Sequence, residues 1–84
     1  MPYTVRVDAR VIRELRRVPS PDARRILDAI DALAPNQKPR GVVRLRGQPG
    51  WRVRVGVYRI LYEVDDARRR VTVYRAGHRR DVYR

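Results

Sequence analysis

Three arginines in one short segment are the residues of this chain best placed to do chemistry. Residues 51–64 read WRVRVGVYRILYEV, two stretches of alternating polar and apolar side chains joined by a Gly-Val pair. Gly56 comes first in that pair, as a type II′ hairpin turn requires. In such a hairpin Arg54 lies directly opposite Arg59, with Arg52 on the same face. Because like charges across a sheet repel, the sequence predicts a face that binds a polyanion, with phosphate as the preferred group. The alternative is a solvated strand face in an arginine-rich protein.

A second group of reactive side chains stands near the C-terminal end. Residues 78–83 read HRRDVY and bring together the only histidine, two arginines, a carboxylate and a phenol. They follow Gly77, which we expect to break the preceding strand and let the chain turn. If that strand returns beside the hairpin, the segment could place a general acid or base next to the arginines. We expect this tail to be too polar to enter the core. The alternative to a functional role is a frayed, charged end of the chain.

Size and composition limit the possible classes of function. The 84 residues form one domain, and the net charge of +12 favours RNA, DNA, ribosomes or anionic membrane surfaces as partners. Lys38 is the only lysine among the 21 basic residues, and guanidinium groups clamp phosphate but are very poor bases. The chain has no cysteine and one histidine, so we expect neither a thiolate nucleophile nor a metal site, and no cofactor. With no apolar signal or membrane-spanning segment, we expect a cytoplasmic protein without a membrane partner.

The elements that must position these residues can be read from periodicity. Residues 3–7 alternate as a first strand does, and Asp8 is placed to cap a short helix that ends at Pro19. A second helix begins with Ser20 as its cap and ends at Pro35. The second helix carries one apolar stripe, formed by Ala23, Ile26, Leu27, Ile30, Leu33 and Ala34.

The second half of the chain predicts a sheet. Residues 42–45 fit either a strand or a helical turn, residues 65–70 a polar connection, and residues 71–76 a last strand. The fold class is therefore α+β: an antiparallel sheet of four strands, or five if residues 42–45 are extended, with an N-terminal helical hairpin on one face. The helix-packed face takes Trp51, Val53, Val55, Tyr58, Ile60 and Tyr62. The opposite face stays open to solvent and carries the arginines.

The chain resembles the RelE/ParE superfamily of bacterial toxins, and more closely its RelE branch of ribosome-associated messenger-RNA endonucleases. The resemblance rests on LRG at residues 45–47, YRILYEVDD at residues 58–66 and GHRRDVYR at residues 77–84, which follow the first strand and the helical hairpin in that order. It implies that residues 1–84 form a single RelE-like toxin domain. It also implies a type II toxin-antitoxin system, in which a cognate antitoxin with acidic residues and an amphipathic helix holds the toxin inactive.

The resemblance also implies a site and a reaction. The catalytic residues would be Arg54, Arg59, Arg79 and Tyr83. RNA or phosphate would be bound by Arg46, Arg52, His78 and Arg80. The implied reaction is metal-independent attack of a ribose 2′-hydroxyl on the adjacent phosphate of messenger RNA in the ribosomal A site. Because this chain has arginine on the strand where some relatives have lysine, His78 and Tyr83 remain as candidates for the base, and we favour Tyr83.

Two other functions stay open at this stage. One is a ParE-like inhibitor of DNA gyrase without nuclease activity, and the other is a non-catalytic RNA-binding module. ParE-like chains usually lack the complete set of two arginines and a tyrosine, so the presence of Arg59, Arg79 and Tyr83 favours the nuclease.

Overall fold

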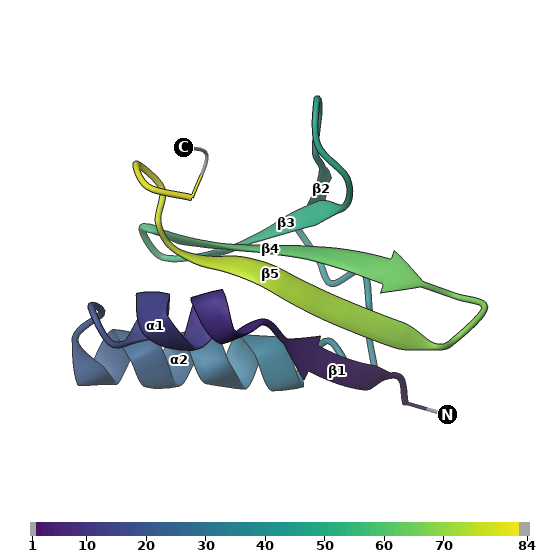
Figure 1. The fold of residues 1–84 in the computed structure, drawn as a ribbon, viewed down its shortest axis with the longest axis horizontal. Coiled ribbons are helices and arrows are strands. Elements are labelled where there is room, and N and C mark those ends of the chain that lie inside the picture. Colours follow the sequence, from purple (N-terminus) through teal and green to yellow (C-terminus); the bar gives the residue numbers. More distant parts are fainter. Residues whose placement is uncertain (1, 83–84) are drawn as a thin grey trace.

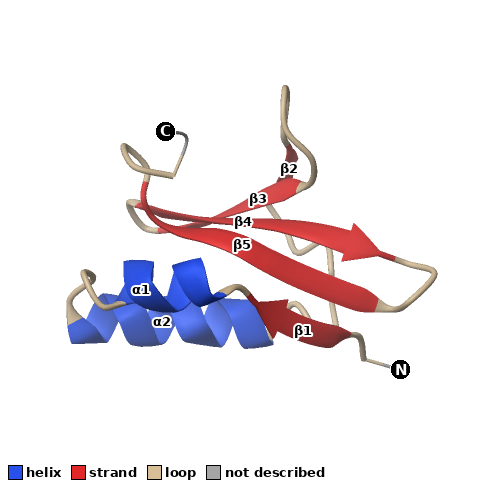
Figure 2. Cartoon of the chain, in the orientation of Figure 1, coloured by secondary structure: helices blue, strands red, loops and turns tan. Residues whose placement is uncertain are grey.

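The computed structural model describes residues 2–82, which form two helices on one face of a five-stranded sheet (Figure 1). In chain order the elements are β1 (Thr4–Val7), α1 (Ala9–Leu15), α2 (Ser20–Asp31), β2 (Val43–Arg44), β3 (Trp51–Val55), β4 (Tyr58–Asp65) and β5 (Arg70–His78). Figure 2 shows both helices on the same side of β4 and β5. The predicted α+β class and the helical hairpin are confirmed. Within residues 2–82 neither helix is long and apolar enough to cross a membrane.

The sheet is mixed rather than antiparallel throughout. Its strand order is β1-β5-β4-β3-β2, and β2, β3, β4 and β5 pair antiparallel to their neighbours. The first strand instead runs parallel to the last, with Val5 opposite Val71 and Val7 opposite Val73. Alternation along a strand reports which face a side chain takes, but it carries no information on direction relative to a strand at the far end of the chain. The short segment at residues 43–44 is extended and forms the fifth strand.

The helix ends differ in detail from the expected caps. Asp8 stands at the N-cap position of α1, but its side chain makes no capping hydrogen bond. Pro19, rather than Ser20, occupies the N-cap position of α2, and Pro21 follows in the first turn, where its missing N–H costs nothing. Leu27 was expected in the apolar stripe but is 40% exposed. It lies about 100° around the helix from Ile26, past the edge of the buried face.

The core forms where the helices meet the predicted apolar face of the hairpin. Ile60 and Tyr62 of β4 are fully buried, and Trp51, Val53, Val55 and Tyr58 pack against the same cluster, as predicted. The Tyr62 hydroxyl donates to the carbonyl of Gln37 at 2.7 Å. Burial raises the pKa of this phenol to about 12. The helix-packed face of the β3–β4 hairpin, on the other side of the sheet from the arginines, is therefore part of the core.

The loop between β2 and β3 depends on one glycine. Gly50 has a φ of +101°, and a Cβ at that position would lie 2.1 Å from the carbonyl oxygen of Tyr62. Only glycine fits both conditions. The Leu45 N–H donates to the Gly50 carbonyl at 3.0 Å and closes the loop. This loop carries Arg46, at the end of β3 remote from the hairpin turn.

Candidate functional site

The β3–β4 hairpin has the register that its sequence predicts. Arg54 pairs with Arg59, while Val53 pairs with Ile60 on the helix-packed face. Gly56 has a φ of +60°, the left-handed value that the first turn residue of a type II′ hairpin needs. Two guanidinium-bearing side chains are therefore held across from each other by local geometry.

This face is less open than expected. Arg59 is only 7% exposed, and Leu61 on the same face is fully buried. The cause is the segment at residues 79–82, which lies across the sheet on the side opposite the helices (Figure 1). Val82 of that segment is 1% exposed. The prediction that the chain end is too polar to enter the core is therefore wrong at Val82.

Gly77 lies beneath this covering segment. The prediction that it breaks the last strand is wrong, because β5 continues through Gly77 to His78 and Gly77 pairs with Arg59. A Cβ on Gly77 would lie 3.6 Å from the Cγ1 atom of Val82. That distance is an ordinary van der Waals contact, so Val82 lies directly over Gly77 at the end of β5.

Backbone hydrogen bonds bring Arg79 to the hairpin. The Arg79 N–H donates to the Val57 carbonyl in the hairpin turn at 3.0 Å. The Asp81 N–H donates to the His78 carbonyl at 2.8 Å, so the chain turns sharply back over the sheet. The backbone of Arg79 therefore lies at the hairpin turn, at the same end of the sheet as Arg54 and Arg59, although it comes from a distant part of the sequence.

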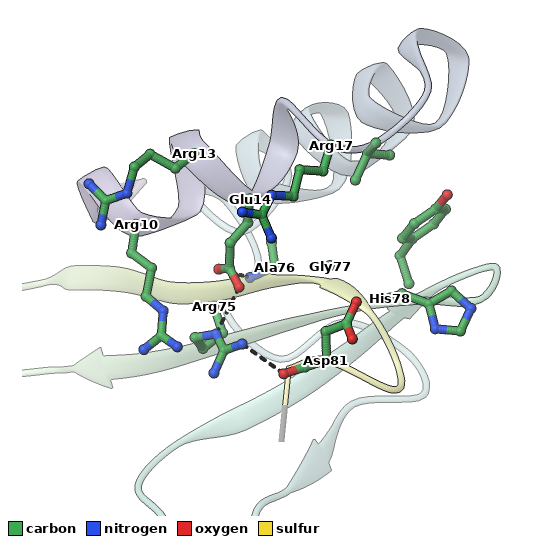
Figure 3. A pocket seen from close by; sticks show the side chains of 11 residues that line it. Arg10, Arg13, Glu14, Arg17, Arg75, Ala76, Gly77, His78 and Asp81 are labelled. Atoms are coloured by element: carbon green, nitrogen blue, oxygen red, sulfur yellow. Dashed lines mark hydrogen bonds and ion pairs between the residues drawn. The ribbon is translucent and has the colours of Figure 1, made fainter. Parts of the chain in front are cut away.

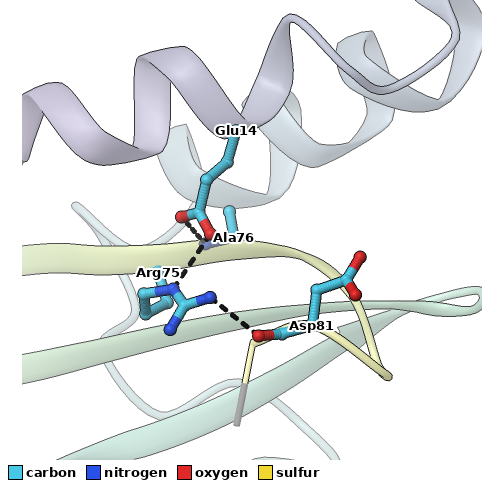
Figure 4. A network of polar contacts seen from close by, with 4 residues as sticks. All are labelled: Glu14, Arg75, Ala76 and Asp81. Carbon is cyan, nitrogen blue, oxygen red and sulfur yellow. Dashed lines mark hydrogen bonds and ion pairs between the residues drawn. The ribbon is translucent and has the colours of Figure 1, made fainter. Parts of the chain in front are cut away.

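A polar network that sequence reasoning missed holds the same segment (Figure 4). Arg75 is 8% exposed; its Nε donates to Glu14 of α1 at 2.9 Å and its Nη2 to the Asp81 carbonyl at 2.8 Å. The second Glu14 oxygen accepts from the Ala76 N–H at 3.1 Å. The Glu14 carboxylate thus accepts a hydrogen bond from an N–H of β5 in the part of that strand that β1 does not pair with. Its position beside Leu15 on the buried side of a helix was the one available sequence signal.

Two of the predicted phosphate-binding residues lie apart from this cluster. Arg46 is in the exposed loop at the other end of β3. His78 pairs with Tyr58 across β4 and β5, and the two rings meet edge to face with centroids 6.1 Å apart. Because Tyr58 packs against the helix-side core, His78 lies on the helix side of the sheet and not with Arg54 and Arg59.

The remaining predicted residues complete the picture. Arg52 lies on β3 beside Leu61, and its Nε is buried without a hydrogen-bond partner among residues 2–82. Arg80 is exposed and its N–H donates to Nδ1 of His78 at 3.1 Å. Tyr83 lies outside the described residues.

We call Arg52, Arg54, Arg59 and Arg79 the arginine face. Its guanidinium groups are permanently charged donors, suited to binding a phosphate and stabilising added negative charge. They cannot accept a proton at ordinary pH. In the part of the chain that the structure describes, no three His, Asp or Glu side chains gather as a metal site.

Comparison with known proteins gives the class. A family model described as the ParE toxin of the type II toxin-antitoxin system parDE matches residues 5–83. Toxin RelG of Mycobacterium tuberculosis is 37% identical, with 100% of this chain and 99% of RelG covered. The chain belongs to the RelE/ParE family of type II toxin-antitoxin toxins, on its RelE-like side, which confirms the predicted family.

Solved structures agree in fold. The toxin-antitoxin complex RelBE2 of Mycobacterium tuberculosis matches with a TM-score of 0.82 and 29% identity, over 94% of this chain and 100% of that one. The RelE-RelB complex of Pyrococcus horikoshii matches with a TM-score of 0.81 and 28% identity, over 94% and 97%. A mutant of Escherichia coli RelE in the free state, 24% identical with a TM-score of 0.78 over 99% and 92%, supports the fold alone.

Proposed function

We propose that this toxin is an endoribonuclease that cleaves messenger RNA in the ribosomal A site. The observation that carries the proposal is the hydrogen bond from the Arg79 N–H to the Val57 carbonyl, which gathers Arg79 with Arg54 and Arg59 at one end of the sheet. The arginine cluster is assembled from two distant segments. A substrate with closely spaced phosphates explains this arrangement better than the alternative of a merely solvated strand face. In this proposal residues 1–84 act as a single toxin domain in the cytoplasm.

The proposed reaction needs no metal. The ribose 2′-oxygen attacks the adjacent phosphorus, the bond from phosphorus to the 5′-oxygen breaks, and the products are a 2′,3′-cyclic phosphate and a free 5′-hydroxyl. The arginine face would stabilise the extra negative charge of the phosphorane. A bound phosphate would also offset the repulsion between Arg54 and Arg59. Tyr83, proposed as the proton acceptor from the family resemblance, lies outside the described residues.

The cognate antitoxin would cover the arginine face. With a net charge of +12 on the toxin, we expect acidic antitoxin residues, an amphipathic antitoxin helix on apolar toxin surface, and fast, salt-sensitive association. The toxin-antitoxin complexes among the solved relatives support an antitoxin as partner.

A second function is kept because the matching family model is that of the ParE toxin. On this alternative the chain inhibits DNA gyrase by binding it, without RNA chemistry. The cluster of Arg54, Arg59 and Arg79 has no required role in that case.

Primer extension on a message in a translation extract separates these functions. We expect discrete new 5′ ends within the A-site codon, and none on the same message without ribosomes. Arg24→Ala, a change on the exposed outer side of α2, should cleave like the wild type and serves as the control. An intact message together with double-strand DNA breaks in a gyrase assay would establish the alternative. If neither RNA cleavage nor DNA breaks appear, the chain is a non-catalytic RNA-binding module.

A further inference from the structure

A groove of ≈ 690 Å³ lies between α1 and the end of β5 (Figure 3). Its lining includes Arg10, Arg13, Arg17, Tyr58, His78 and Asp81. The proposed reaction uses none of Arg10, Arg13 and Arg17, which we call the α1 arginines, Arg17 lying in the turn just after α1. His78, which the fold separates from the arginine face, faces into this groove instead.

One wall of the groove carries positive charge that the protein does not neutralise. Arg10, Arg13 and Arg17 recur three and four positions apart, so they share one side of α1 and the turn after it. None of the salt bridges among residues 2–82 includes them. Two carboxylates, Glu14 and Asp81, also line the groove. Both Glu14 oxygens accept hydrogen bonds, from Arg75 Nε and from the Ala76 N–H, and Asp81 forms no salt bridge with these arginines among residues 2–82. The α1 arginines are therefore left to bind an external anion.

The opposite wall offers an aromatic ring. His78 is half-buried against the edge of Tyr58, and its Nδ1 accepts the Arg80 N–H. With Nδ1 as the acceptor, Nε2 is the ring nitrogen left to donate a hydrogen bond. Guanidinium groups and a flat ring that line one groove match a nucleotide, which joins a phosphate to a base. An acidic peptide would need an aromatic residue beside its carboxylates to offer the same two groups, whereas every nucleotide carries both.

We propose that this groove binds a nucleotide of single-stranded RNA, with its phosphate on the α1 arginines and its base against His78. The inference rests on the proposed function, because it extends the path of the RNA substrate. The turn at residues 78–82 carries Arg79 toward the hairpin and His78 toward the groove. An RNA strand on the arginine face would pass this turn and enter the groove at the end of β5.

Binding of a 2′-O-methyl RNA oligonucleotide tests the phosphate contacts without cleavage, because its 2′-oxygen cannot attack. Affinity is measured by fluorescence anisotropy across a salt series for the wild type, R13A/R17A and R24A/R68A. The last variant removes the same charge at exposed positions outside the groove. For R13A/R17A we expect the slope of log affinity against log salt to become shallower by about 1.4, at about 0.7 per phosphate contact on a single strand. The slope of R24A/R68A should stay at the wild-type value.

An abasic version of the oligonucleotide tests the base contact. Wild-type protein should bind it about tenfold more weakly than the oligonucleotide with bases, the usual scale for losing one stacked base. In His78→Ala this difference should vanish, while the salt slope stays unchanged.

Equal slope changes in the two double variants would overturn the inference, since the charge would then act only as a diffuse field. So would a wild-type slope in R13A/R17A, or poly-glutamate of matched charge binding as tightly as RNA. If the groove variants behave as expected but the wild type cleaves no message in the extract, the groove stands and the proposed function fails. If the wild type cleaves the message but R13A/R17A binds RNA like the wild type, the proposed function stands and the groove inference fails.

Discussion

The β3–β4 hairpin and the segment at residues 79–82 contribute arginines to the same face, yet different forces hold them. The hairpin is a local structure: a two-residue turn with Gly56 at φ +60° sets the pairing of Arg54 with Arg59. The C-terminal segment has no such local rule. Two hydrogen bonds hold it, from the Arg79 N–H to the Val57 carbonyl and from the Arg75 side chain to the Asp81 carbonyl, together with the burial of Val82.

This difference teaches that the two halves of the candidate site can be disturbed separately. A change in the Glu14–Arg75 network should loosen the C-terminal segment and leave the hairpin register in place. A change in the hairpin should leave that network intact, since Arg75 holds Glu14 of α1 and the Asp81 carbonyl.

The largest effect is expected where both halves are needed at once. Arg59→Ala and Arg79→Ala should each lower the single-turnover cleavage rate by about 10²–10³-fold, the usual loss for one preorganised charge stabiliser. Similar losses would mean that hairpin and segment act on one phosphate. Melting temperatures measured alongside separate this from unfolding, which matters because Arg59 is buried. Wild-type cleavage by Arg79→Ala would remove the C-terminal segment from the site.

The next effect is on stability and concerns the segment alone. Arg75→Met should lower the free energy of unfolding by about 3 kcal/mol, because it leaves Glu14 uncompensated in a mostly buried place. Amide hydrogen exchange should speed up at Asp81 and Val82 and stay slow in β3 and β4.

The matched control for that change is the double variant Glu14→Gln/Arg75→Met. It should lose less than the sum of the single changes, since two partners of one buried pair couple. Additive losses, or exchange that rises equally in the hairpin, would show that the two regions are not held separately.

A smaller, pH-dependent effect belongs to the buried side of the hairpin. The pKa of Tyr62 is about 12 in the folded protein against an ordinary value near 10, so the folded state holds this proton more tightly. Its contribution to stability is complete below about pH 10 and is lost as pH rises toward 12, by at most about 1.4 kcal/mol per pH unit. Urea unfolding at alkaline pH should show this decline, and Tyr62→Phe should flatten it. An equally steep decline in Tyr62→Phe would assign it to other phenols, such as Tyr58, whose pKa burial also raises.

The smallest effect is expected on the exposed side of the same hairpin. Because Arg54 and Arg59 repel across the strands, Arg54→Ala should leave the free energy of unfolding unchanged or raise it by a few tenths of a kcal/mol. Thermal melting at low salt measures this. A clear loss of stability would mean that Arg54 has a stabilising partner, and that repulsion between Arg54 and Arg59 does not dominate its contribution.

The sequence by itself determined the elements whose rules are local. Alternation and a Gly-first turn predicted the hairpin with Arg54 opposite Arg59, and helical spacing bounded by Pro19 predicted the helical hairpin, because these patterns act between near neighbours. Only the tertiary structure decided that β1 runs parallel to β5, that Gly77 continues the strand, and that His78 turns to the helix side. It also decided that Val82 is buried and that Glu14 meets Arg75. Each of these depends on groups that are distant in sequence and acquire their energies only when the sheet and the helices come together.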